Sequence, residues 1–396
     1  MRVPVVLAGL ALLASPFIAV APAAATSPPL TVTADMPAAI PAGHNWSFND
    51  FFPRTLSVPT GSTVEFANTS FHTSTLLPAG ETPAQDNLAW GLLKPDPDDA
   101  TPNPNGTTHS QFFVPAILPS PATGCGSAAD PCTFDGTSVV SSGAPMGPPS
   151  GPFSVKIEAN PGVYWFHCRI HPGMEGRLDV LPANAQGTTQ AELSAAAASQ
   201  VTADVEAGYV AEAKAQNATP RKNADGTKTW MMTAGTSSPD GHVAILEMLP
   251  RNLHIRSGDT VVWRPLSPNE PHTVTFPHEL NSDIVPLCES AGGDVPAVPN
   301  HLPPQGPFDF HCGVVPFPDE LELGGGNGNA TISSPATISD SGIVAPNAEV
   351  DAFGVPRTAV LPSWAVHFTG AVPGTYHYLC QIHEGMEGQI TVVPGS

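Results

Sequence analysis

The chain has 396 residues, enough for two domains of ordinary size, and carries a formal net charge of −21 at pH 7. Such acidity argues against binding to nucleic acid or to anionic lipid and favours a cationic partner. Only 12% of the residues are charged, while proline occurs 47 times. This composition is typical of a loop-rich β protein rather than a helical one.

The first 25 residues have the form of a secretory signal peptide. Arg2 is followed by an apolar run and then by the small-residue stretch APAAA, so we expect cleavage after Ala25 and export of the mature protein. A membrane anchor is the alternative. The run contains prolines, however, and no later segment of the sequence has the ~20 apolar residues that a bilayer span requires. We therefore predict no stable membrane insertion.

The mature chain repeats itself. Residues 43–77 and 241–276 share a Gly-His pair, a Pro-Arg pair, a turn glycine, an alternating strand and a His-Thr-x-Thr motif. Near the ends of the two copies, PGVYWFHCRIHPGMEGRLDVLP aligns without a gap with PGTYHYLCQIHEGMEGQITVVP. These features predict a duplicated domain.

Each copy reads as short β-strands separated by Pro/Gly turns. Apolar residues alternate in residues 62–66 of the first copy and 259–263 of the second. The same period of two ends the copies, at 177–181 and 389–393. Many short strands with such turns predict an all-β sandwich for each copy.

Between the copies, residues 188–216 are rich in Ala, Glu and Gln, which predicts one linker helix. Thr189 and Glu192 match the capping-box pattern, and Pro220 bars further helix. We expect a helix of roughly 40 Å, at ~1.5 Å per residue, that packs on one or both sandwiches, because propensity alone stabilises a lone helix little. An apolar stripe recurs every four residues, at Leu193, Ala197, Val201, Val205 and Tyr209.

The predicted organisation is therefore all-β, with two sandwiches joined by a helical linker. Its boundaries are 1–25 for the signal peptide, 26–182 for the first domain, 183–224 for the linker and 225–396 for the second domain. Six cysteines in an exported chain indicate disulfides. Cys168 and Cys380 lie inside the repeated motif, and the others form two local pairs, Cys125 with Cys132 and Cys288 with Cys312.

The repeated Cys-x-x-His-x-x-Met motif supplies a thiolate, an imidazole and a thioether from one loop. Copper that alternates between Cu(I) and Cu(II) suits a thiolate, two imidazoles and a weak axial thioether. Zinc is the competing metal, but it prefers closed Cys/His sets and does not use methionine. The second imidazole would come from a histidine about a hundred residues upstream. The predicted copper ligands are His72, Cys168, His171 and Met174 in the first copy and His272, Cys380, His383 and Met386 in the second.

These motifs resemble the cupredoxin (plastocyanin/azurin-like, type 1 blue copper) family, and the loop spacing is most similar to amicyanin. The resemblance implies a Greek-key sandwich and a type 1 copper in each domain, and one-electron transfer with a redox partner protein. It covers the mature chain except the helix and the long segments before each motif cysteine. By analogy, His171 and His383 would expose their ring edges as electron ports. Glu384, beside the second port, would favour a partner with a basic surface.

Three other copper functions would leave different signs in the sequence. Copper sequestration or delivery would use the same ligands but would more often show Met- and His-rich tracts, and the chain has only eight Met. Multicopper oxidases use His-x-His pairs, which this sequence lacks. Copper nitrite reductases place a histidine beside the type 1 cysteine, as His167 is, but Leu77 and Pro78 stand where its partner would be. We therefore predict an electron carrier rather than an enzyme.

Several histidines remain after the proposed ligands. His44 and His242 recur in the Gly-His pairs, which could mark a further site, although a conserved turn from the duplication is the simpler interpretation. His301 and His311 lie near Cys312, where we favour a disulfide over a metal site.

Overall fold

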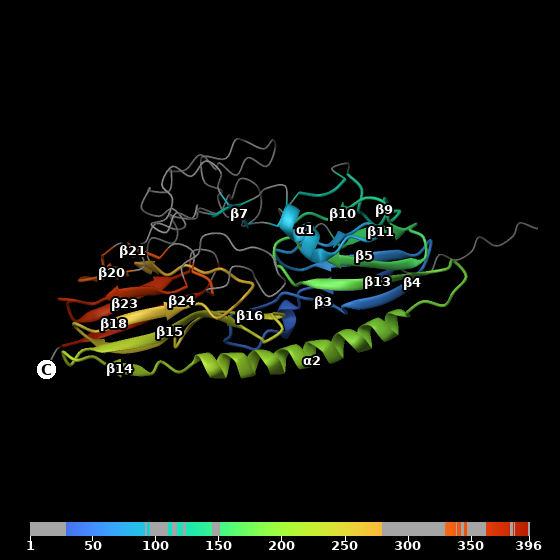
Figure 1. Cartoon of the computed structure of the whole chain (residues 1–396). Coiled ribbons are helices and arrows are strands. Elements are labelled where there is room, and N and C mark those ends of the chain that lie inside the picture. Colours follow the sequence, from blue (N-terminus) through green and yellow to red (C-terminus); the bar gives the residue numbers. More distant parts are fainter. Residues whose placement is uncertain are drawn as a thin grey trace, which may run out of the picture.

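In the computed structural model, two β-rich bodies lie side by side and one long helix runs beneath both (Figure 1). The fold class predicted from the sequence is confirmed. The structure describes residues 29–91, 93–95, 110–112, 116, 118–121, 124–144, 151–278, 329–337, 339–341, 344–346, 362–380, 383 and 385–394. The signal peptide, the Cys288–Cys312 pair, His301, His311 and Glu384 lie outside these residues.

The first copy folds into two five-stranded sheets. One has the order β3 (Phe51–Phe52), β1 (Leu30–Ala34), β5 (Thr63–Asn68), β11 (Phe153–Ile157) and β9 (Cys132–Phe134). The other has the order β10 (Val140–Ser141), β6 (Thr75–Leu76), β12 (Gly162–His167), β13 (Glu175–Leu181) and β4 (Thr55–Pro59). The chain changes sheet between β4 and β5, between β5 and β6, and between β11 and β12. These are crossings of the Greek-key type.

The second copy repeats this arrangement. Its smaller sheet has the order β17 (Asn252–Arg256), β24 (Glu387–Val393), β23 (Gly374–Leu379), β19 (Thr275–Phe276) and β21 (Ser339–Asp340). Its larger sheet contains β16 (Val243–Leu249), β15 (Lys228–Ser237), β18 (Thr260–Arg264), β22 (Trp364–His367) and β20 (Asn329–Thr331), with β14 (Pro220–Lys222) paired to β15.

A strand of the first copy completes the larger sheet of the second. β2 (Trp46–Phe48) pairs antiparallel with β16, with Trp46 opposite Ile245 and Phe48 opposite Val243. Both strands follow the Gly-His pair of their own copy, so corresponding segments meet across the junction. The two sandwiches are therefore joined by backbone hydrogen bonds as well as by the linker.

Helix α2 (Gln190–Ala215) is the predicted linker. Thr189 and Glu192 form the capping box, each side chain accepting from the other residue's backbone N–H. Leu193 packs in the core of the first sandwich, while Ala197, Val201 and Val205 pack on a separate cluster at the junction. The prediction that the helix packs on the sandwiches is confirmed, and its apolar face explains why it remains helical outside a bundle.

Within the part of the chain that the structure describes, three apolar cores hold the molecule together. In the first sandwich the rings of Phe51, Phe66 and Phe166 meet edge to face, and in the second Trp263 packs on Tyr378. The third core lies at the junction, between β2, β16 and α2, and its buried members are Trp46, Phe48, Phe52, Ala211, Ala215, Val243, Ile245 and Leu249. Burial of this third core fixes the two sandwiches relative to each other.

Smaller elements complete the described part of the chain. They are the 3-10 helix η1 (Pro37–Ala39), helix α1 (Pro83–Trp90) and the hairpin of β7 (Leu93–Pro95) with β8 (Ser110–Phe112). The predicted Cys125–Cys132 disulfide is present. No helix within the described residues is long and apolar enough to cross a membrane.

Candidate metal centres

The first candidate centre lies at the end of the first sandwich, where β12 gives way to β13. His72 comes from the segment between β5 and β6, and Cys168 directly follows β12. The loop then folds back on itself, as the sequence predicts. The backbone N–H of Cys168 donates to the Met174 carbonyl at 2.9 Å, and that of Met174 to the His171 carbonyl at 3.1 Å. Gly173, with φ of 92°, permits this tight turn.

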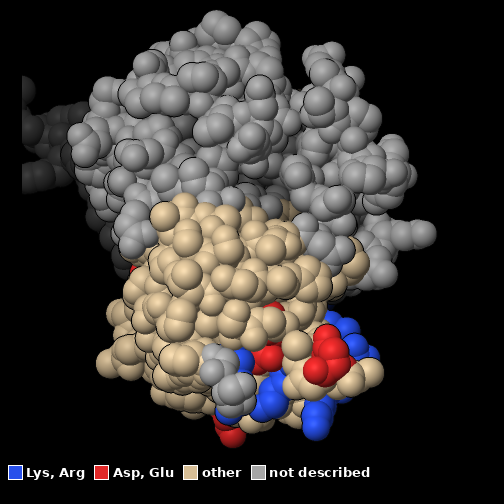
Figure 2. All heavy atoms as spheres, turned by 90° about the vertical axis from the view of Figure 1, so that its left-hand side faces the viewer, with Lys and Arg blue, Asp and Glu red and all other residues tan. Residues whose placement is uncertain are grey.

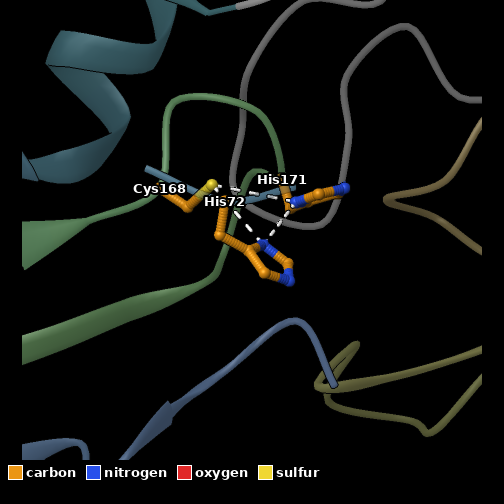
Figure 3. A group of neighbouring side chains, drawn as sticks. All are labelled: His72, Cys168 and His171. Atoms are coloured by element: carbon orange, nitrogen blue, oxygen red, sulfur yellow. Dashed lines mark hydrogen bonds between the residues drawn. The ribbon is translucent and has the colours of Figure 1, made fainter. Parts of the chain in front are cut away.

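Three donor atoms converge at this centre (Figure 3). Cys168 Sγ lies 3.8 Å from His72 Nδ1 and 3.7 Å from His171 Nδ1, and the two nitrogens are 2.9 Å apart. Donors bound to one first-row metal ion, at about 2.0 Å for nitrogen and about 2.3 Å for sulfur, are roughly 3.2 to 3.7 Å apart at tetrahedral to trigonal angles. The two sulfur–nitrogen distances match this spacing to within about 0.1 Å, and the nitrogen–nitrogen distance of 2.9 Å is slightly shorter, so a small separation of the two rings would let the three side chains hold one metal ion.

The second centre repeats this geometry. Cys380 Sγ lies 3.6 Å from His383 Nδ1, which is 3.2 Å from His272 Nδ1. The loop closes through the same two backbone bonds, Cys380 to Met386 at 2.8 Å and Met386 to His383 at 3.2 Å. Gly385, with φ of 71°, takes the place of Gly173. The sequence repeat is thus also a repeat of the candidate centre.

The two loop methionines are buried beside these donors. Met174 belongs to the same apolar cluster as Cys168, and Met386 to the same cluster as Cys380. Each methionine is 1% exposed. Each motif loop therefore buries its methionine in the same core as its cysteine.

The surroundings of both motif thiols favour the thiolate form. Backbone N–H groups of Thr73 and Ile170 donate to Cys168 Sγ at 3.3 Å each, and Thr273 N–H donates to Cys380 Sγ at 3.3 Å. Burial by itself raises the pKa of both thiols, but the two histidines of each centre outweigh it and bring both pKa values well below the ordinary value. A thiolate is the form that binds metal.

The upstream histidines differ in what their other nitrogen meets. In the first centre, His72 Nε2 lies 3.6 Å from Oδ2 of buried Asp35. Burial lowers the pKa of His72, but Asp35 and Cys168 overcome this and raise it to about 10. In the second centre, His272 Nε2 has no hydrogen-bond partner among the described residues. Burial is the main reason that the pKa of His272 is lowered.

The loop histidines meet a shared carboxylate between the two sandwiches. Glu270 Oε1 lies 3.5 Å from His171 Nε2, and Glu270 Oε2 lies 3.3 Å from His383 Nε2. The side chains of the two histidines are only 14% and 13% exposed. The structure therefore differs from the expectation of two solvent-facing electron ports: both rings point toward the junction.

His167, the residue beside the first motif cysteine, is committed elsewhere. Its ring is fully buried, and Nε2 lies 2.9 Å from Asp86 Oδ2 on α1. Arg169 holds the same carboxylate through Nε and Nη2 at 2.7 Å each. This buried triad anchors α1 to the loop that carries Cys168. The contact with Asp86 gives His167 a structural role, and His167 belongs to none of the possible metal-ligand groups among the described residues.

The Gly-His histidines lie beside α2, in two clusters that each include an arginine. His44 Nδ1 is 2.7 Å from Glu212, while Arg251 pairs with neighbouring Glu247 at 3.0 Å. His242 lies near Asp50 and Asp204. Arg54 forms an ion pair with each of these two aspartates. Since each cluster includes a carboxylate of α2 and an arginine that pairs with at least one of its acidic side chains, we interpret the clusters as attachments of the helix rather than as metal sites.

Sequence reasoning missed Asp35 and Glu270. Both touch predicted ligand histidines through contacts that are distant in sequence. A signal was present: Thr33-Ala34-Asp35 aligns with Thr233-Ala234-Gly235, and Glu270 stands two residues before His272 where Ser70 precedes His72. A comparison of the two copies could therefore have singled out positions 35 and 270, because the residue type differs there between otherwise similar segments.

Comparisons with known proteins find similarity only among solved structures. No family model and no curated protein matches this chain. Reduced auracyanin from the photosynthetic bacterium Roseiflexus castenholzii is 17% identical and matches 41% of this chain and 95% of its own, with a TM-score of 0.21. Auracyanin A from Chloroflexus aurantiacus, a "blue" copper protein, is 16% identical over 42% of this chain and 98% of its own, also with a TM-score of 0.21.

A reduced amicyanin variant is 14% identical and matches 45% of this chain and 94% of its own, with a TM-score of 0.17. These values are too low to transfer the role of any residue. The β-sandwich fold of each half rests on its own two sheets. The assignment of donors likewise depends on the distances given above.

Proposed function

We propose that the protein is an electron carrier with two type 1 copper sites, one in each sandwich. In the first site His72, Cys168 and His171 would hold the ion, with Met174 as the weak axial ligand. In the second site the ligands would be His272, Cys380, His383 and Met386. The observation that carries this proposal is the convergence of one buried thiol and two Nδ1 atoms, twice in one chain.

Copper bound to such a donor set supplies reversible one-electron chemistry. The chain's own residues would make that chemistry fast by keeping the ligands fixed. Backbone N–H groups orient each sulfur, and the back-folded loop ties the histidine to the methionine. Because the donors are buried in packed cores, they have little freedom to rearrange when the charge of the site changes. These features support a carrier more than a store.

Copper sequestration or delivery remains the second candidate function. It would use the same ligands, but a site that transfers its metal to another molecule must be accessible, and the cysteines are 0% and 3% exposed.

An enzymatic function would need a further metal site. Within the described residues, the other acid and histidine clusters already contain Arg54 or Arg251.

Export and the nature of the partner belong to the same proposal. Residues 1–25 would direct export, and a redox partner protein, with a basic surface, would exchange electrons with the carrier. Figure 2 views the free end of the second sandwich, where basic and acidic side chains gather at the lower right and most of the remaining described surface is uncharged. Charge on this face is mixed, so the acidic net charge of the chain is the feature that favours a basic partner.

The test is the copper content and visible spectrum of the purified mature protein, with Cys168→Ala and Cys380→Ala examined separately. Two coppers per chain, an intense thiolate-to-Cu(II) band and the loss of about half of that band in each variant are expected. A colourless protein, or colour that survives both substitutions, would contradict the proposal. Copper that moves readily to a chelator from an otherwise intact protein would favour delivery instead.

A further inference from the structure

Glu270 occupies a position that the proposed function does not explain by itself. It precedes the ligand His272 by two residues, yet its carboxylate does not turn toward that ring's free nitrogen. Instead its two oxygens lie 3.5 Å from His171 Nε2 and 3.3 Å from His383 Nε2. One side chain of the second sandwich thus contacts the loop histidine of each candidate centre.

The placement of this carboxylate is specific. Glu270 is 3% exposed, and a carboxylate buried to that degree is costly unless it is paired and hydrogen-bonded. Asn49, from the first sandwich, donates its amide to Oε1, while the backbone N–H of Glu270 donates to Ser267 Oγ at 3.1 Å. The side chain is therefore held from both sandwiches. The equivalent residue of the first copy, Ser70, donates instead to Asp35 at 2.6 Å.

The orientation of the His171 and His383 rings shows which nitrogen of each ring Glu270 contacts. In each loop histidine Nδ1 faces the motif cysteine, at 3.7 Å in the first centre and 3.6 Å in the second, and Nε2 faces Glu270. A carboxylate on the outer nitrogen of a metal-bound histidine fixes the ring and raises its basicity. A single carboxylate does this for two centres here.

We propose that Glu270 couples the two copper sites, serving as an outer partner of both and as the connection through which they exchange an electron. This inference rests on the proposed function. In the exchange, one site is oxidised by one electron and the other is reduced by one, so no proton or additional reactant is required. The route runs from His171 through the carboxylate to His383. The negative charge of Glu270 stabilises the more positive, oxidised state of both sites.

The test uses Glu270→Gln in two proteins that each retain one site, made with Cys380→Ala and Cys168→Ala respectively. Glutamine keeps the size of the side chain and an oxygen for Asn49 but removes the charge. The reduction potential should rise in both single-site proteins. Asp35→Asn is the matched control, because Asp35 touches a ligand of the first site only and should raise only that potential.

A second measurement follows the electron directly. In the two-site protein, one site is reduced by a short pulse and the return to equilibrium between the sites is recorded from the visible spectrum. Glu270→Asp keeps the charge but is one methylene shorter and cannot reach both rings at once. It should slow the exchange severalfold while changing the potentials less than glutamine does, and it remains informative if Glu270→Gln does not fold.

A rise in potential at the second site alone would overturn the inference, because Glu270 would then serve only its own sandwich. An unchanged exchange rate in Glu270→Asp would overturn it as well. Copper content and the two blue bands of the unaltered protein test the proposed function separately. If the unaltered protein binds two coppers and shows both bands but the Glu270 variants do not behave as expected, only the inference about Glu270 fails. If the copper or the bands are missing, the proposed function itself fails.

Discussion

The two candidate centres have the same donors but not the same surroundings. Asp35 and Gly235 occupy equivalent positions, and both adopt left-handed backbone conformations, with φ of 62° and 70°. In the first copy the Asp35 carboxylate meets His72, whereas in the second copy the His272 ring itself fills the space. A Cβ at position 235 would lie 1.9 Å from His272 Nε2. The two copies therefore share the predicted ligands but differ at the position behind the upstream histidine.

This difference predicts two unequal reduction potentials. A carboxylate behind a ligand histidine favours the more positively charged metal, so the first site should have the lower potential. An electron in the molecule would then rest mainly on the second site. Variants at Asp35 and Gly235 test whether these two residues cause the difference between the centres.

The largest effect is expected from Gly235→Ala. The new methyl group would collide with the His272 ring and displace a predicted ligand, so copper content should fall from two per chain toward one. The first site should keep its copper and its colour. Copper analysis after dialysis, together with the visible spectrum, measures this outcome.

Gly226→Ala is the control for that substitution. Gly226 also has a positive φ, of 90°, but a Cβ there meets nothing within 4 Å. It should therefore cost only the ~1–2 kcal/mol of left-handed backbone strain and retain both coppers. Equal copper loss in the two variants would show that backbone strain, not the His272 ring, makes glycine necessary at position 235.

A smaller effect is expected from Asp35→Asn. The substitution removes the charge behind His72, and the loss of such a partner typically weakens metal binding by about 10–100-fold. Copper affinity at the first site should fall by that factor, and its potential should move toward that of the second site. Competition with a copper chelator in the Cys380→Ala background measures the affinity.

Asp135→Asn is a suitable control for Asp35→Asn, because Asp135 lies in the same sandwich and its carboxylate accepts hydrogen bonds from nearby Thr137 rather than contacting a predicted ligand. If both variants weakened copper binding equally, the general loss of negative charge would be responsible. The contrast between the two centres would then no longer depend on the contact with His72.

The smallest effect concerns how α2 is attached to the first half. Burial, followed by repulsion from Asp50, raises the pKa of Asp204 to about 7 from 3.8. Because this pKa is higher in the folded than in the unfolded state, its contribution to stability is present below about pH 4 and is lost as the pH rises to about 7. Asp204→Asn should flatten this fall and raise the free energy of unfolding at pH 8 by on the order of 1 kcal/mol.

Denaturant unfolding at pH 5 and pH 8 measures that change. Glu206→Gln, which alters an exposed carboxylate on the same helix, should leave the pH profile in place. If Asp204→Asn had the same slope as the unaltered protein, the aspartate would be ionised throughout by its pairing with Arg54.

The features that sequence could predict are those with local signals. The Cys-x-x-His-x-x-Met loops, the capping box at Thr189 and the short strands are each encoded within a few neighbouring residues. The pairing of His72 with Cys168 was predictable only because the duplication repeats it. The domain boundaries and the axial roles of the two methionines stay predictions.

What escaped prediction depends on contacts between distant segments. Nothing in the alternation of apolar residues in β2 specifies that its edge will pair with β16 rather than with a strand of its own copy. The contact of Glu270 with His171 likewise arises only once the sandwiches are packed together. Analogy with single-domain carriers therefore placed the loop histidines at solvent, whereas the junction covers them.

The pairing of β2 with β16 has a consequence for how the halves can exist. A chain cut after α2 would leave β16 with an open edge and would leave β2 projecting without its partner. Open edges of this kind recruit other strands. The separated second half should associate with itself or with the first half, so neither half is expected to behave as an independent protein.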